Sequence, residues 1–201
     1  MRVLAMKQRI PEKYATQRAD IEAAALIVSR LEEKAKAVRA DAHLSEAGRW
    51  DALRKELAGG ARSHLAQLQK NNLAALASIA AQKKALLPAV KDRTDTIGEM
   101  RRAELRAFLR GLPQGERTKM ALSGDPAMIE ALVDQPAVLS GLSEELRAQA
   151  VDVYVAKTHG ETAARIEADQ EALENVRVAL HLAKIDLERI SGAPVVLEAA
   201  E

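Results

Sequence analysis

Residues 161–190 read ETAARIEADQEALENVRVALHLAKIDLERI, and this stretch decides the fold class. Its apolar side chains fall on two heptad positions: Ile166, Leu173, Leu180 and Leu187 on one, and Val176, Ala183 and Ile190 on the other. A seven-residue repeat with a second apolar position three residues later is typical of a helix packed against other helices. We therefore expect a long, coiled-coil-like C-terminal helix over 161–191 with a buried seam.

The same period recurs near the beginning of the chain. Over 12–42 the apolar heptad positions are Tyr14, Ile21, Val28, Ala35, Ala24, Leu31 and Val38. Ser45 is a good N-cap for a return helix whose first apolar position is Trp50 and which runs toward Pro88. We expect Gly59-Gly60 to kink this helix without ending it. The pattern predicts a long antiparallel helical hairpin over 12–90, with Trp50 at least half buried beside its turn.

The middle of the chain indicates shorter helices. A helix over 96–110 stops at Gly111-Leu-Pro113, and Asp125-Pro126 restarts the chain with an N-cap and a proline at the first helical position. Pro136 breaks that helix. Ser143 begins another that is expected to end at His159, with Gly160 as the residue after the end and the imidazole near the last carbonyls.

The predicted fold is thus all-α, with more than about 65% helix and no sheet of any size. Its segments are an N-terminal arm over 1–11, the helical hairpin over 12–90, a small bundle of short helices over 91–160, the C-terminal helix over 161–191 and a tail over 192–201.

Composition narrows the class of protein further. Aromatic residues make up only 2% of the chain, which favours thin helix-on-helix seams over a thick core. There is no cysteine, so disulfides and thiolate metal sites are excluded. No apolar run reaches the ~18 residues of a membrane span, and Met1–Pro11 does not resemble a signal peptide. We expect synthesis in the cytoplasm and no membrane partner.

No catalytic or cofactor motif is present. None of the four histidines has a glutamate three residues before it, and His-Glu-x-x-His, glycine-rich phosphate loops and serine-nucleophile motifs are all missing. The sequence therefore favours a non-enzymatic protein with no cofactor, no metal and no small-molecule substrate.

Charge is divided between the two parts of the chain. Residues 1–119 hold 24 Lys/Arg and 14 Asp/Glu, whereas residues 120–201 hold 6 and 15. We expect the basic and acidic segments to meet, and in the sharper form of the hypothesis to meet between subunits of a homo-oligomer. The basic cluster Arg101, Arg102, Arg106 and Arg110 either meets the acidic half or makes non-specific DNA contacts.

Candidate residues for self-association or partner contact belong to three groups. They are the basic cluster Arg101, Arg102, Arg106 and Arg110; the seam Ile166, Leu173, Leu180 and Leu187; and the apolar tail Val195, Val196 and Leu197. The tail is either a frayed end or a docking segment for a neighbour.

Two features resemble helical proteins encoded by tailed phages and prophages. The first is the turn Asp41-x-x-Leu44-Ser45-x-x-Gly48-Arg49, with Ala47 where such turns often have Glu. The second is the pair of segments 122–127, LSGDPA, and 135–141, QPAVLSG. The resemblance implies a virion or assembly role, such as a head, neck or accessory protein with other virion proteins as partners, and assigns no functional residue. The alternative is a cytosolic helical adaptor, scaffold or chaperone that binds a protein client.

Overall fold

The computed structural model describes residues 2–88, 94–133 and 135–196. The protein is 83% helical, and no strand occurs in these ranges, so the predicted all-α class is confirmed. No helix in the described ranges is both long enough and apolar enough to cross a membrane. The chain divides into two compact units, which are described separately: unit 1 comprises Met1–Ser78 and Ala168–Glu201, and unit 2 comprises Ile79–Glu167.

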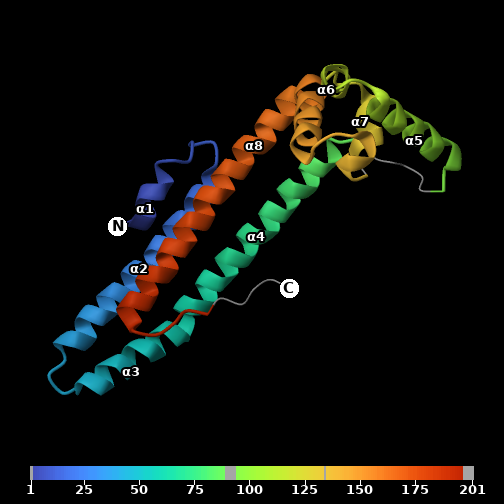
Figure 1. The fold of residues 1–201 in the computed structure, drawn as a ribbon. Helices are drawn as coiled ribbons and strands as arrows, with labels where there is room; N and C mark the ends of the chain where they lie inside the picture. Colours follow the sequence, from blue (N-terminus) through green and yellow to red (C-terminus); the bar gives the residue numbers. More distant parts are fainter. Residues whose placement is uncertain (1, 89–93, 134, 197–201) are drawn as a thin grey trace. The chain divides into compact units, whose positions relative to one another are not determined.

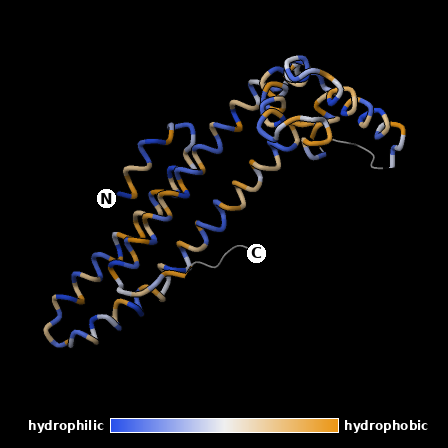
Figure 2. The backbone as a smooth tube through the Cα atoms, in the orientation of Figure 1, coloured by the Kyte–Doolittle hydropathy of each residue, from blue (hydrophilic) through white to orange (hydrophobic). Residues whose placement is uncertain are grey.

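Unit 1 is a helical bundle around one apolar core (Figure 1). Its elements are α1 (Arg2–Lys7), α2 (Ala15–Ala40), α3 (Glu46–Glu56), the π-helical turn η1 (Leu57–Ala61), the first part of α4 (Arg62–Ala85) and the last part of α8 (Glu144–Ser191). Apolar and polar residues alternate along α2 and this part of α8 in Figure 2. Their apolar residues face one another in the core, as ridges and grooves of adjacent helices do.

The predicted seams are buried. On α2 the buried heptad residues are Ile21, Ala24, Val28, Leu31 and Ala35. On α8 they are Leu173, Val176, Leu180, Ala183, Leu187 and Ile190 in unit 1, and Ile166 in unit 2. The heptad interpretation is therefore confirmed for both helices. The partner of the α8 seam in unit 1 includes α2, so the predicted two-helix hairpin is part of a larger bundle.

The turn between α2 and α3 has the predicted chemistry. The Ser45 side chain accepts a hydrogen bond from the Gly48 backbone N–H at 3.1 Å. Trp50 is 37% exposed, so the prediction that it is at least half buried is confirmed. Its ring lies against Gly192, which follows α8 in a left-handed conformation with φ 62°. A Cβ atom at Gly192 would lie 2.9 Å from Trp50 Cζ3, so only glycine fits both the turn and the ring.

The glycine pair produces a kink, as predicted. At η1 the Arg62 N–H donates to the Leu57 carbonyl, and Gly60 takes a φ of 145° that other residues rarely adopt. Helix α3 leads directly into this turn, and α4 follows directly after it.

Two local features add to the sequence interpretation. The N-terminal arm is helical at α1, because Val3, Met6 and Ile10 bury their side chains in the unit 1 core. Two helical segments meet at a kink at His159 (φ −133°, ψ 25°) within α8, so the expected helix end at this residue is confirmed, although Gly160 does not take a left-handed conformation. The His159 ring instead packs edge-on against Tyr154, with ring centroids 6.1 Å apart.

Unit 2 is a cluster of short helices between parts of two long ones. It contains the end of α4, α5 (Thr96–Gly111), α6 (Gln114–Ala121), α7 (Pro126–Val133), the 3₁₀ helix η2 (Ala137–Ser140) and the beginning of α8. Asp125 and Ser143 cap α7 and α8 as predicted, accepting from the backbone N–H groups of Met128 and Leu146. The core of unit 2 contains Leu109, Ile129, Leu132 and Tyr154 among others.

The units do not follow the predicted segment boundaries. Both α4 and α8 contribute to each unit, and the kink at His159 lies within unit 2. This arrangement mixes the basic and acidic segments. Unit 1 holds 17 Lys/Arg and 16 Asp/Glu, and unit 2 holds 13 of each, so neither unit carries a large net charge.

Candidate interaction surface

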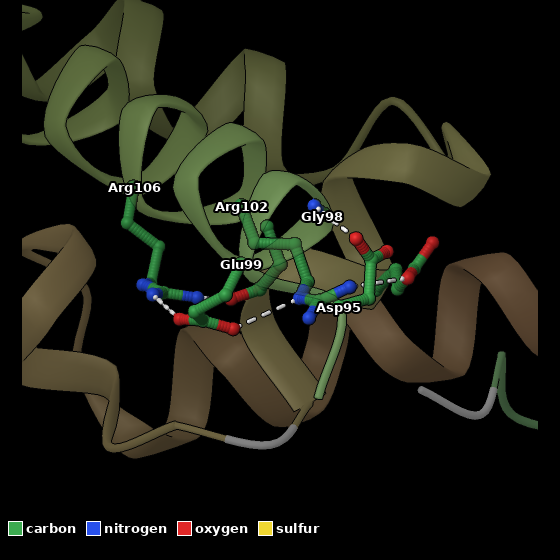
Figure 3. A network of polar contacts seen from close by, with 7 residues as sticks. Asp95, Gly98, Glu99, Arg102 and Arg106 are labelled. Atoms are coloured by element: carbon green, nitrogen blue, oxygen red, sulfur yellow. Dashed lines mark hydrogen bonds and ion pairs between the residues drawn. The ribbon is translucent and has the colours of Figure 1, made fainter. Parts of the chain in front are cut away.

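Helix α5 begins at a well-formed cap. The Asp95 side chain accepts a hydrogen bond from the Gly98 backbone N–H at 2.9 Å (Figure 3). A Cβ atom at Gly98 would collide with the Asp95 carboxylate and would lie 3.2 Å from Arg102 Nη1. The missing side chain at position 98 therefore leaves space for both the cap and the first inward arginine.

The inward face of α5 carries two buried arginines. Arg102 and Arg106 are 8% and 6% exposed. The Glu99 carboxylate lies between them and accepts from Arg102 Nε at 3.0 Å and from Arg106 Nη2 at 2.6 Å (Figure 3). Arg102 Nη1 also donates to Glu130 at 3.0 Å, and Arg106 Nη1 donates to the Ala131 carbonyl at 3.1 Å. These contacts attach α5 to α7.

The electrostatics of this network are mutually supportive. Hydrogen bonds from Arg106 and then Arg102 hold the pKa of the Glu99 carboxyl below its ordinary value. Burial disfavours the charge on Arg102, but the carboxylates of Glu99 and Glu130 outweigh it and raise the Arg102 pKa. Glu99 and Arg102 therefore stay ionised at neutral pH, and the network holds α5 in one orientation.

Arg110 and Arg117 likewise bind carbonyl groups of unit 2. Arg110 Nη1 donates to the Leu139 carbonyl at 3.1 Å. The Arg117 guanidinium donates to four carbonyls, those of Leu109, Arg110, Leu112 and Gly141, at 2.7–3.1 Å. It therefore caps the end of α5 and joins it to the segment after η2.

These contacts revise the expectation for the basic cluster. The Arg102–Glu130 ion pair shows a basic and an acidic segment meeting inside the chain. Arg102 and Arg106 do not form an open basic face, since both are buried and paired. Of the four arginines in the cluster, Arg101 alone has an exposed side chain without a contact to another described residue.

The outward face of α5 is apolar. Ile97, Met100 and Phe108 are 75%, 60% and 51% exposed, and Arg101 and Glu104 beside them are also exposed. The spacing of these five residues places them on one side of the helix, opposite Arg102 and Arg106. We call Ile97, Met100, Arg101, Glu104 and Phe108 the outer stripe. Helix α5 is thus partly inverted relative to an ordinary surface helix: two arginines are buried beside Leu109, and three large apolar side chains face solvent.

The other residues expected to contact partners are mostly occupied within their own units. Ile166, Leu173, Leu180 and Leu187 are buried. Val195 is buried too, and its N–H donates to Glu188 at 3.0 Å. Val196 is exposed, while its carbonyl accepts from Arg62 Nε at 3.0 Å. Leu197 lies outside the described residues.

A shallow groove lies on the described part of each unit. The groove on unit 2, about 660 Å³, lies between the end of α4 and α8, and its walls include Leu86, Leu87, Val151, Val155 and Ala163. The groove on unit 1, about 560 Å³, lies between α2 and the η1 turn and has charged edges. Among the residues that the structure describes, no group of His, Cys, Asp and Glu could hold a metal ion.

The sequence interpretation missed two features, the buried Asn72 and the inverted helix. Asn72 occupies an apolar heptad position on α4 and donates to the Leu173 carbonyl at 3.0 Å. For α5 the apolar pattern is ambiguous, because Leu105 and Leu109 mark one possible inner face and Ile97 and Phe108 another. Comparison of the chain with protein-family models, with curated proteins and with solved structures gives no match.

Proposed function

We propose that this chain is a non-enzymatic structural or assembly subunit that works through protein contacts on its helix surfaces. The observation that supports this best is the outer stripe of α5. Three large apolar side chains in one stripe are unusual on a free surface and are characteristic of protein–protein contact sites. The exposed charges of Arg101 and Glu104 at its centre give such a contact directional specificity.

The stripe is also held rigidly from behind. The Asp95 cap, the Glu99–Arg102–Arg106 network and the Arg117 contacts fix both ends and the middle of α5. A surface that is already ordered loses little conformational entropy on binding. The inward charges thus serve the contact by presenting the apolar face in a fixed orientation.

For the wider setting we propose a phage virion, as a head, neck or accessory protein, on the basis of the turn at Asp41–Arg49 and the short-helix segments after Leu122. The alternative is a helical adaptor, scaffold or chaperone. The apolar groove on unit 2 favours that alternative, because its Leu, Val and Ala walls suit an apolar segment of a protein client.

Native mass spectrometry of the chain isolated from cells that produce it tests the proposal. We expect stoichiometric complexes, and their loss in the double variant Ile97→Ser/Phe108→Ser with helicity by circular dichroism unchanged. The control is Val178→Ser/Ile185→Ser, which removes two exposed apolar side chains, 42% and 41% exposed, from α8. A wild-type chain found only as a monomer would show the proposal to be wrong. Retention in the finished particle would favour a structural subunit, and release before completion a chaperone or scaffold.

A further inference from the structure

We infer that the partner of the α5 outer stripe is the same stripe on a second copy of the chain, paired antiparallel about a twofold axis. This inference rests on the proposed function, because it identifies the partner of that same surface. The axis lies between Arg102 and Ala103, halfway between Arg101 and Glu104 and also halfway between Ile97 and Phe108.

The stripe is complementary to itself only in this orientation. In an antiparallel pair about that axis, Ile97 of each copy faces Phe108 of the other, and Arg101 faces Glu104. Each contact occurs twice by symmetry, which gives two apolar pairs at the ends and two ion pairs in the middle. A parallel pair would instead place Arg101 against Arg101 and Glu104 against Glu104, which is repulsive.

Both central charges are available for such pairing. Arg101 and Glu104 are exposed, and neither forms an ion pair with another described residue. The arginines at positions 102 and 106 are turned inward to Glu99 and Glu130. The outer stripe therefore presents one positive and one negative charge to a neighbour, in the arrangement that a twofold contact requires.

The expected dimer is weak. Three partly exposed apolar side chains amount to a few hundred Å² per copy, which is at the small end of specific interfaces. We expect dissociation in the micromolar to millimolar range, and the apolar ends to contribute most of the affinity while the charges select the orientation.

A charge-exchange experiment tests the pairing. Sedimentation velocity of the purified full chain is measured over a concentration series for the wild type, Arg101→Glu, Glu104→Arg and the double exchange. Each single variant places like charges opposite one another twice, so we expect dimerisation to weaken about tenfold. The double exchange should restore it. An equimolar mixture of the two single variants should form a heterodimer, because every central pair is then complementary.

The control variant is Arg165→Glu, which makes the same charge change at an exposed position of α8 and should leave dimerisation unchanged. Circular dichroism of every variant checks that it is folded.

Disulfide formation tests the orientation separately. Because the chain has no cysteine, Ile97→Cys and Phe108→Cys can each be made as single-cysteine proteins. Antiparallel pairing predicts that a disulfide forms between the two variants when they are mixed. It predicts little disulfide between two copies of the same variant. Two copies of the same position would be separated by about 11 helical residues, roughly 16 Å. Disulfides preferentially within each variant would overturn the antiparallel arrangement.

A wild-type chain that stays monomeric at all concentrations would overturn the pairing. The proposed function would still stand if complexes in cells persisted and were lost in Ile97→Ser/Phe108→Ser, since the stripe would then bind a different protein. A dimer that is unaffected by either single charge variant would also overturn the inference, because its contact would lie elsewhere.

Discussion

Unit 1 and unit 2 both have an apolar core, but beneath α5 unit 2 also buries two arginines. In unit 1 the facing surfaces of α2 and α8 are Ile, Val, Leu and Ala, arranged in heptads. In unit 2 the inward face of α5 combines Leu109 with Arg102 and Arg106, and its large apolar residues Ile97 and Phe108 face solvent. The apolar period alone therefore identifies the buried face of a long helix but not that of α5.

The difference follows from helix length. The last four carbonyls of any helix lack partners within it, and these form a large share of the polar groups in an eight-residue helix such as α7. Arginine and lysine side chains supply the missing donors. Arg106 binds the Ala131 carbonyl, Arg147 the Val133 carbonyl and Lys157 the Ser123 carbonyl. In this cluster of short helices, cationic side chains therefore supplement the apolar core by binding carbonyl groups that lack partners.

The largest effect is expected in the apolar seam of unit 1. Leu187→Ala removes a fully buried side chain and should lower the free energy of unfolding by about 3 kcal/mol, from lost burial and a residual cavity. Ile185→Ala on the same helix removes an exposed side chain and should change it by less than about 0.5 kcal/mol. Urea denaturation of both variants measures the difference. Equal losses would contradict the assignment of the seam.

The next effect tests how much the contacts between cations and carbonyl groups add to the stability of unit 2. Arg117→Ala deprives four carbonyls of a donor and should lower the free energy of unfolding of unit 2 by about 2–3 kcal/mol. Arg117→Lys should recover only part of this, because an ammonium group lacks the planar set of donors. The control is Lys119→Ala on the same helix, an exposed residue that should be nearly neutral. Full recovery by lysine would show that charge alone matters.

A smaller effect concerns the start of α5. Alanine normally stabilises a helix relative to glycine by about 1 kcal/mol. At Gly98 the added methyl group would displace the Asp95 cap. Gly98→Ala should therefore lower the free energy of unfolding by about 1 kcal/mol. At Gly115 of α6 an added Cβ meets no atom within 4 Å, and Gly115→Ala should stabilise. Thermal unfolding of both variants measures the two changes in stability. If both variants were stabilised, or both destabilised, the account of the cap would be refuted.

The smallest effect is the dependence of stability on pH. Because the folded-state pKa of Glu99 lies below the ordinary 4.5, its contribution is complete above that value and is lost as the pH falls through the folded pKa. Glu144 behaves in the same way, since the Ala137 N–H and then Arg147 lower its pKa. In the variant Glu99→Gln, the free energy of unfolding should therefore fall less steeply as the pH is lowered below 4.5. Urea denaturation over a pH series measures this dependence. The same pH dependence below 4.5 in the variant and the wild type would mean that the network does not stabilise the fold.

Much of the fold could be predicted from the sequence because its signals are local or strictly periodic. The heptads at Ile21–Ala35 and Leu173–Leu187, and the caps at Ser45, Asp125 and Ser143, depend on neighbouring residues only. The helix over α1 was missed because its three apolar side chains are too few to show a period. The kink at His159 falls where the sequence predicts a helix end, because a glycine after the last helical residue is a local signal.

The interaction surface could not be predicted in the same way. Arg102 and Arg106 are indistinguishable from solvent-exposed arginines until Glu130 and the Ala131 carbonyl are placed beside them by the fold. The orientation of α5 then decides which of its two apolar sets is buried. Both facts depend on contacts between residues far apart in the chain.

Thiol labelling of two adjacent positions tests the inverted orientation of α5 most directly. In the cysteine-free chain, Phe108→Cys and Leu109→Cys are compared at low protein concentration, where a weak dimer is dissociated. The account predicts that the thiol at position 108 reacts nearly as fast as in an unfolded peptide and that the thiol at position 109, fully buried in the native chain, is strongly protected. Rapid labelling at 109 with protection at 108 would mean that α5 faces the other way, and the outer stripe would not exist.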